Sequence, residues 1–214
     1  MTEDDIRPWG ETFVRAGAKA VPYFGDSILM VLDQVIVRRR ASALEVMGGI
    51  VRRVGGQEKL AARLASPEIE SLFMEGLESA MRTGVAAKRR LLALVIANAV
   101  LDDAKVDASQ LYVMALRDLE APHIRALARL ARTVQELQPQ LPSDLTERPP
   151  FVEAANERVR KIWNAEPAPI QAALVRTGCV RFPRGWLLSS HEIDQHITDF
   201  GFELLNDLER QGSI

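Results

Sequence analysis

The stretch Leu91 to Leu101, LLALVIANAVL, constrains the fold of this chain more than any other part of it. Every position in the stretch is apolar except Asn98. A helix with this sequence has no polar face to turn toward solvent, so other elements must surround it. It is too short to span a membrane, which takes about 20 apolar residues. The stretch therefore predicts the central helix of a helical bundle.

Glycine and proline divide the rest of the first half into further helices. Asp26 or Ser27 is expected to cap a long helix that runs to the pair Gly55–Gly56. The triplet Ser66-Pro67-Glu68 predicts another start, because serine caps helices, proline suits the first turn and an acid suits the positive end of the helix dipole. That helix is expected to end near Gly84.

The composition limits the class of protein. The 214 residues are 47% hydrophobic and 26% charged, which is typical of a globular domain. The single cysteine, Cys179, has no partner for an internal disulfide and cannot build a cysteine metal cage. The sequence opens with an acidic, polar segment, so we expect no secretory signal. We expect a cytoplasmic location, no transmembrane segment and no cofactor.

After Asp107 the pattern changes to shorter helices, which begin near Ala108 and near Pro122. A proline-rich connector follows, then a short helix around 151–163 and another over 170–177 that ends at Gly178. The segment from Cys179 to Leu188 has strand character, and the sequence ends in an amphipathic helix opened by Thr198 and Asp199. This order predicts helix, strand, loop, strand and helix over the last part of the chain.

That order resembles the end of a winged-helix domain. The segment LVRTGCV is similar to the exit of the family's third helix, and ITDFGFELLNDL is similar to its return from the wing. The resemblance implies a winged-helix-like domain over residues 106–214. Together with the apolar helix at Leu91 to Leu101, it predicts a mainly α protein whose residues 1–105 form a helical bundle. The winged-helix-like domain would contain one β-hairpin and, as a departure from the family, a helical insertion around 138–165.

The segment HEIDQH, residues 191–196, is close to the zinc-protease motif but differs in spacing. A zinc-binding helix needs its two histidines four positions apart, on one face. His191 and His196 are five apart, so they diverge on a helix and lie on opposite faces of a strand. We expect no metal site here and interpret the segment as the return strand of the wing.

A winged helix often binds DNA, with its third helix in the major groove. Here the contacts would be Gln171, Arg176 and Thr177 on that helix and Arg181 and Arg184 in the wing. Against this, residues 101–214 contain 13 basic and 17 acidic residues, whereas the first 100 contain 14 basic and 12 acidic. Phosphate binding needs lysine and arginine, so the acidic half favours a protein-contacting module, and DNA binding stays the alternative.

The first half resembles the helical bacterial proteins grouped as Abi-alpha, a name linked to phage abortive infection. The resemblance rests on SPEIESLFMEGLESAM, on the basic entry to the buried helix in AAKRRLLALVIANAV, and on the leucine and histidine segment that follows. It implies a role in phage defence and carries no catalytic residues. The expected function is therefore a non-enzymatic interaction or regulatory protein.

Two further interpretations concern charged residues. Arg117 and His123 in RDLEAPH are near the arginine–histidine spacing of HEPN ribonucleases, in which histidine would move a proton. Pro122 stands between them and is expected to separate two helices, which weakens this alternative. Lys88–Arg90 are expected to form a solvated collar at the entry of the buried helix, with anion binding as the alternative for them and for Arg38–Arg40.

The last expectation is a homodimer held mainly by helices between Ile6 and Val54. This region contains much apolar surface, including the run Ile28 to Val37, and large exposed apolar patches mark interfaces. Closed homodimers are also the commonest assembly. The alternative is that these side chains fill the core of a monomer. A monomer in solution would favour a subunit that needs a different protein partner.

Overall fold

The computed structural model describes residues 25–144, 148–181 and 197–212, and these residues are mainly helical, as expected. They contain two short 3-10 helices, Asp103–Lys105 and Gln138–Gln140, and nine α-helices. The α-helices are α2 (Gly25–Val54), α3 (Gln57–Arg63), α4 (Pro67–Arg82), α5 (Ala86–Leu101), α6 (Val106–Asp118), α7 (Ala121–Leu137), α8 (Arg148–Ala165), α9 (Ala168–Arg176) and α10 (Asp199–Arg210).

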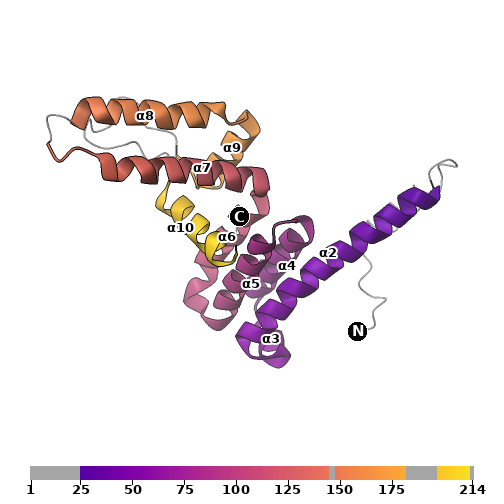
Figure 1. The fold of residues 1–214 in the computed structure, drawn as a ribbon. Coiled ribbons are helices and arrows are strands. Elements are labelled where there is room, and N and C mark those ends of the chain that lie inside the picture. The colour runs from indigo at the N-terminus through magenta and orange to yellow at the C-terminus, as the bar shows by residue number, and fades with distance from the viewer. Residues whose placement is uncertain (1–24, 145–147, 182–196, 213–214) are drawn as a thin grey trace.

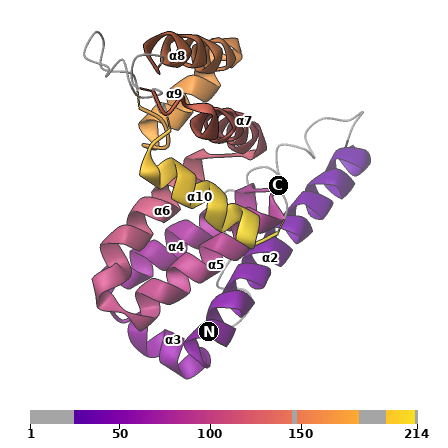
Figure 2. The same cartoon turned by 60° about the vertical axis from the view of Figure 1, so that its left-hand side comes forward.

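Helix α5 is the centre of the bundle. It packs against α2, α4, α6 and α10, and Figure 2 shows these helices around it. Leu91, Leu92 and Ile96 are completely buried. Removing each such side chain from water contributes about 1.5–3 kcal/mol to folding. The prediction that the apolar stretch forms a surrounded helix is confirmed.

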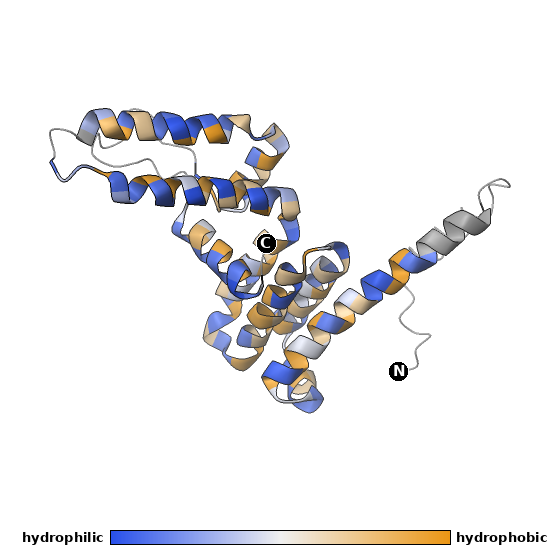
Figure 3. Cartoon of the chain, viewed as in Figure 1, coloured by the Kyte–Doolittle hydropathy of each residue, from blue (hydrophilic) through white to orange (hydrophobic). Residues whose placement is uncertain are grey.

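Only the last part of helix α2 packs on the bundle. Its last part buries Val46, Ile50 and Val54, and it packs on α4 and α5. Its first part extends away from the other helices, as Figures 1 and 3 show. The helix ends at Gly55 and Gly56, whose φ angles of +87° and +130° favour glycine. The predicted end of this helix is confirmed, whereas Asp26 and Ser27, which were expected to cap it, lie inside the helix.

The second half builds outward from the bundle. Helix α7 packs against α8 and α9, while α10 contacts both α5 and α7 and so joins the two parts (Figure 1). The expected helix around 151–163 is longer, since α8 spans Arg148–Ala165. The expected domain boundary after residue 105 falls at the start of α6, which packs on α4 and α5.

The expected β-hairpin is not seen among the described residues, which contain no strand. They contain one isolated antiparallel bridge, between Val180 and Ile197. The segment HEIDQH and Arg184 lie outside the described residues. After the bridge, Thr198 caps α10 by accepting a hydrogen bond from the Gly201 amide at 3.0 Å, so the predicted start of the last helix is confirmed.

Among the described helices, none combines the length and the apolar character that crossing a membrane requires.

Candidate functional site

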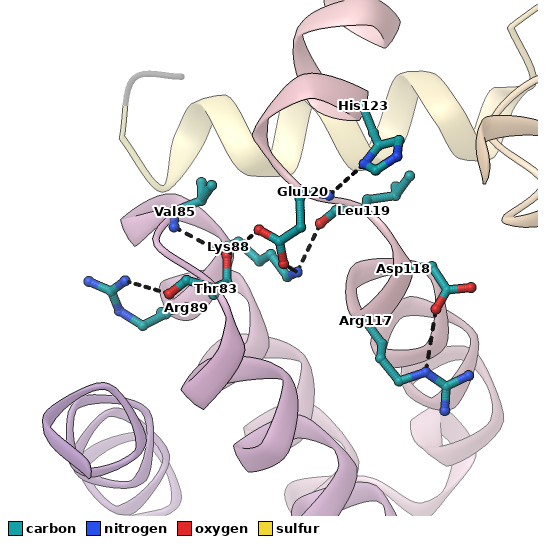
Figure 4. Close-up of polar contacts among 9 residues, drawn as sticks. All are labelled: Thr83, Val85, Lys88, Arg89, Arg117, Asp118, Leu119, Glu120 and His123. Atoms are coloured by element: carbon teal, nitrogen blue, oxygen red, sulfur yellow. Dashed lines mark hydrogen bonds and ion pairs between the residues drawn. The ribbon is translucent and has the colours of Figure 1, made fainter. Parts of the chain in front are cut away.

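The most unusual polar group of the described residues is Lys88, in the first turn of α5. Its side chain has no exposed surface. The Lys88 Nζ donates hydrogen bonds to Glu120 Oε1 at 2.7 Å and to the Leu119 carbonyl at 2.8 Å (Figure 4). The expectation of a solvated collar is wrong for this residue, because the turn between α6 and α7 covers the start of α5.

Glu120 connects three segments of the chain. One carboxylate oxygen binds Lys88, and the other accepts a hydrogen bond from Thr83 Oγ1 at 3.0 Å, just after α4 ends. Glu120 is also the N-cap of α7, where its side chain accepts from the backbone amide of His123. The end of α4, the start of α5 and the start of α7 therefore meet at one carboxylate (Figure 4).

The electrostatics of this cluster favour a structural role. Burial lowers the pKa of Lys88, and the hydrogen bond and negative charge of Glu120, with the charge of Asp118, oppose that effect. A lysine with a lowered pKa can act as a base or nucleophile, but an amine without exposed surface gives a substrate no access. We therefore interpret the Lys88–Glu120 ion pair as a structural contact that holds the start of α5 against the start of α7.

The two candidates for a ribonuclease site are placed on different helices and point apart. Arg117 is near the end of α6 and its side chain points toward Asp118, away from His123 (Figure 4). His123 is in the first turn of α7, where its Nδ1 accepts a hydrogen bond from the Glu120 amide at 3.0 Å. Arg117 is thus engaged in an ion pair with Asp118, and His123 in the cap of α7.

The structure instead brings Arg117 close to residues proposed for DNA contact. Arg117 and Arg176 both bind Asp118, with Nε–O distances of 3.5 and 3.1 Å. Together with Thr177 and the apolar side chains of Leu111, Met114 and Phe200 they line a pocket of about 420 Å³. Sequence reasoning did not connect these residues, because 58 positions separate Asp118 from Arg176.

The other candidates for DNA contact have the following places. Gln171 donates to the carbonyls of Trp163 and Glu166, at 2.8 and 3.0 Å, and so fixes the corner between α8 and α9. Thr177 donates to the Ala173 carbonyl at 2.9 Å, within its own helix end. Arg181 is exposed, and Arg184 lies outside the described residues.

No group of His, Cys, Asp and Glu in the part of the chain that the structure describes has the arrangement of a metal site. Cys179 is buried, and burial raises the pKa of its thiol while a hydrogen bond from Thr177 opposes the change. A buried, protonated thiol is a poor nucleophile. Cys179 is therefore not placed to act as a nucleophile.

Comparison with protein-family models, with curated proteins and with solved structures found no match. The resemblances to Abi-alpha proteins and to winged-helix domains therefore stay predictions.

Proposed function

We propose that this protein is a non-enzymatic interaction protein that pairs with a second copy of itself through the outer face of α2. The outer face is defined here by Val37, Ala41 and Leu44. Val37 and Leu44 are 64% and 65% exposed, although both are large and apolar. This exposed apolar surface on a projecting helix is the observation that carries the proposal.

The outer face is distinct from the face that α2 turns to the bundle. Positions three, four and seven apart lie on one side of a helix, so Val37, Ala41 and Leu44 form a single stripe. The residues that α2 buries against the bundle are Val46, Ile50 and Val54. At 100° per residue, Val46 and Ile50 point more than 100° away from Val37 and Leu44. The helix therefore has a second apolar stripe that the bundle does not cover.

A second copy fits this stripe for geometric reasons. In an antiparallel pair with its two-fold axis at Ala41, Val37 of one copy lies close to Leu44 of the other. The small side chain at Ala41 lets the two helix axes approach to about 8–10 Å. The two-fold axis makes the same stripe serve both copies, as a closed dimer requires. Of the region Ile6 to Val54 expected to form the dimer, residues 6–24 lie outside the described residues.

The proposal includes a winged-helix-like second half that contacts protein, in the cytoplasm of a bacterium, with a role in phage defence. The antiparallel bridge between Val180 and Ile197 supports the hairpin, because it joins the two ends of the segment 181–196 as the base of a hairpin does. Phage defence is supported by the resemblance to Abi-alpha proteins alone. Plating phage on a host that expresses the chain tests that part.

Sedimentation velocity on matched variants tests the dimer. Val37→Glu and Leu44→Glu place charge at the centre of the proposed interface, and Leu111→Glu places it on α6, where Leu111 is 63% exposed. We expect the first two variants to sediment as monomers and the Leu111 variant to remain a dimer. Dimers in all three variants would contradict the proposed interface. A monomer in the Leu111 variant alone would show that the dimer forms through α6 and not through α2.

A further inference from the structure

A second pocket opens where α5, α7 and the end of α10 meet. Its volume is about 400 Å³, within the range of small-molecule sites, about 300–1,000 Å³. Two arginines are among the residues that line it, Arg90 on α5 and Arg125 on α7. The rest of its wall is apolar or backbone: Val85, Ala86, Ala87, Ala121, Ile124 and Gly212.

The charges around this pocket do not balance within the described residues. Lys88 is paired with Glu120, and Arg89 with Glu45 at an Nε–O distance of 2.7 Å. Among the described residues, Arg90 has the Gln211 carbonyl as its one acceptor. Arg125 has no hydrogen bond or ion pair with any described residue. Two arginines from different helices thus line one pocket, and its described lining contains no carboxylate.

Glu120 directly precedes the lining residue Ala121, and its two carboxylate oxygens are bound by Lys88 and Thr83. The pocket wall also contains the first residues of α5 and α7. Figure 4 shows these two helix starts close together, at Val85 and at Glu120. Helix α5 has no acid in its first turn and no side-chain cap. The partial positive charge of the α5 start, which has no acidic cap, adds to that of the arginines.

We propose that this pocket binds a small organic phosphate. The phosphate lies between the guanidiniums of Arg90 and Arg125, which match its oxygens through paired N–H donors. The organic part packs against Val85 and Ile124. An anion there supplies the negative charge that the described residues lack. Arginine is suited to this role because its guanidinium stays charged at every physiological pH.

Isothermal titration calorimetry with phenyl phosphate, inorganic phosphate and phenol tests the site on the full chain. We expect phenyl phosphate to bind, inorganic phosphate to bind more weakly and phenol not to bind. Arg125→Gln and Arg90→Gln should each weaken phenyl phosphate binding at least about tenfold, since each removes charge-assisted hydrogen bonds. Arg132→Gln is the matched control, because Arg132 is an exposed arginine on the same face of α7, two turns beyond the pocket.

Arg125 is exposed and has no described partner, so its replacement leaves the fold intact, which circular dichroism verifies. Equal weakening by Arg132→Gln would show unspecific attraction and overturn the proposal. Absence of phenyl phosphate binding by the unmodified chain, or equal binding of phenol, would overturn it as well. Equal affinity for phenyl phosphate and inorganic phosphate would contradict the proposed packing of an organic group against Val85 and Ile124.

Discussion

The ammonium group of Lys88, which is completely buried, lies 2.7 Å from a carboxylate oxygen of Glu120, whose side chain is 39% exposed. The two partners of this ion pair therefore differ in what they lose when the other is removed. Without Glu120 the ammonium stays enclosed with only the Leu119 carbonyl to accept from it. Without Lys88 the carboxylate turns to water and still binds Thr83.

This difference predicts unequal costs for two substitutions. We expect Glu120→Ala to lower the free energy of unfolding by up to about 3 kcal/mol, at the low end for breaking a buried pair because Glu120 is partly exposed. Lys88→Met should cost clearly less, since the methionine fills the same space and leaves no buried charge. Urea denaturation of both variants measures the costs. A larger loss for Lys88→Met would show that the pair itself, and not the enclosed charge, sets the stability.

His123→Ala tests whether this histidine is a cap or a catalyst. The Glu120 amide donates to His123 Nδ1 at 3.0 Å, so the substitution removes one acceptor at the start of α7. We expect a loss of about 1 kcal/mol in unfolding free energy and no change in metal-free RNA cleavage by the purified chain. Arg117→Ala is the comparison. Cleavage by the unmodified chain that either variant abolishes would support the ribonuclease alternative.

The raised pKa of Tyr112 predicts that the free energy of unfolding depends on pH in the alkaline range. Its hydroxyl donates to Asp207 Oδ2 at 3.2 Å, and burial together with the negative charge of Asp207 raises the pKa of Tyr112 to about 12. The pKa of Tyr112 in the folded protein is above the ordinary value of 10.0. The contribution of Tyr112 to the free energy of unfolding is therefore complete below pH 10.0 and is lost as the pH rises toward about 12. The difference in unfolding free energy between the unmodified chain and Tyr112→Phe should shrink over that range. Because Cys179 and Lys88 are present in both chains, a difference that grows with pH would contradict the assignment.

Gly201 and Gly76 predict how two tightly packed helix positions respond to one added methyl group. A Cβ at Gly201 would overlap the carbonyl oxygen of Cys179, which is backbone and cannot move aside. A Cβ at Gly76 would meet the end of the flexible Ile96 side chain. We expect Gly201→Ala to cost about 1–3 kcal/mol and Gly76→Ala to cost less. Thermal unfolding of both variants measures this order, and the reverse order would be inconsistent with the close approach of α10 to Cys179.

Local patterns were enough to predict most helices. Apolar runs, glycine pairs and Ser66-Pro67 marked α2, α4 and α5, because helix periodicity and helix ends depend on neighbouring residues. The start of α4 is correct, although the Ser66 hydroxyl donates to Glu68 Oε2 at 3.0 Å and caps no backbone amide. The short helix α3 was not predicted, since its seven residues are too few to show a period.

Long-range contacts were not predictable from local patterns. Lys88 was expected in solvent because a lysine at the entry of an apolar helix has the same local pattern whether it is covered or not. The covering residue, Glu120, lies 32 positions further along the chain. Arg125 was not singled out, because only the tertiary fold places it in the same pocket as Arg90. Pairs of charged residues that form sites between helices depend on the tertiary fold.

The mass of the unmodified chain in solution tests the proposed pairing through α2 most directly. The chain has a mass of 23.8 kDa. Multi-angle light scattering at micromolar concentration should give twice that mass, because the exposed stripe of Val37, Ala41 and Leu44 is then covered by a second copy. A mass of 23.8 kDa under the same conditions would contradict the pairing and would leave this stripe to a different partner.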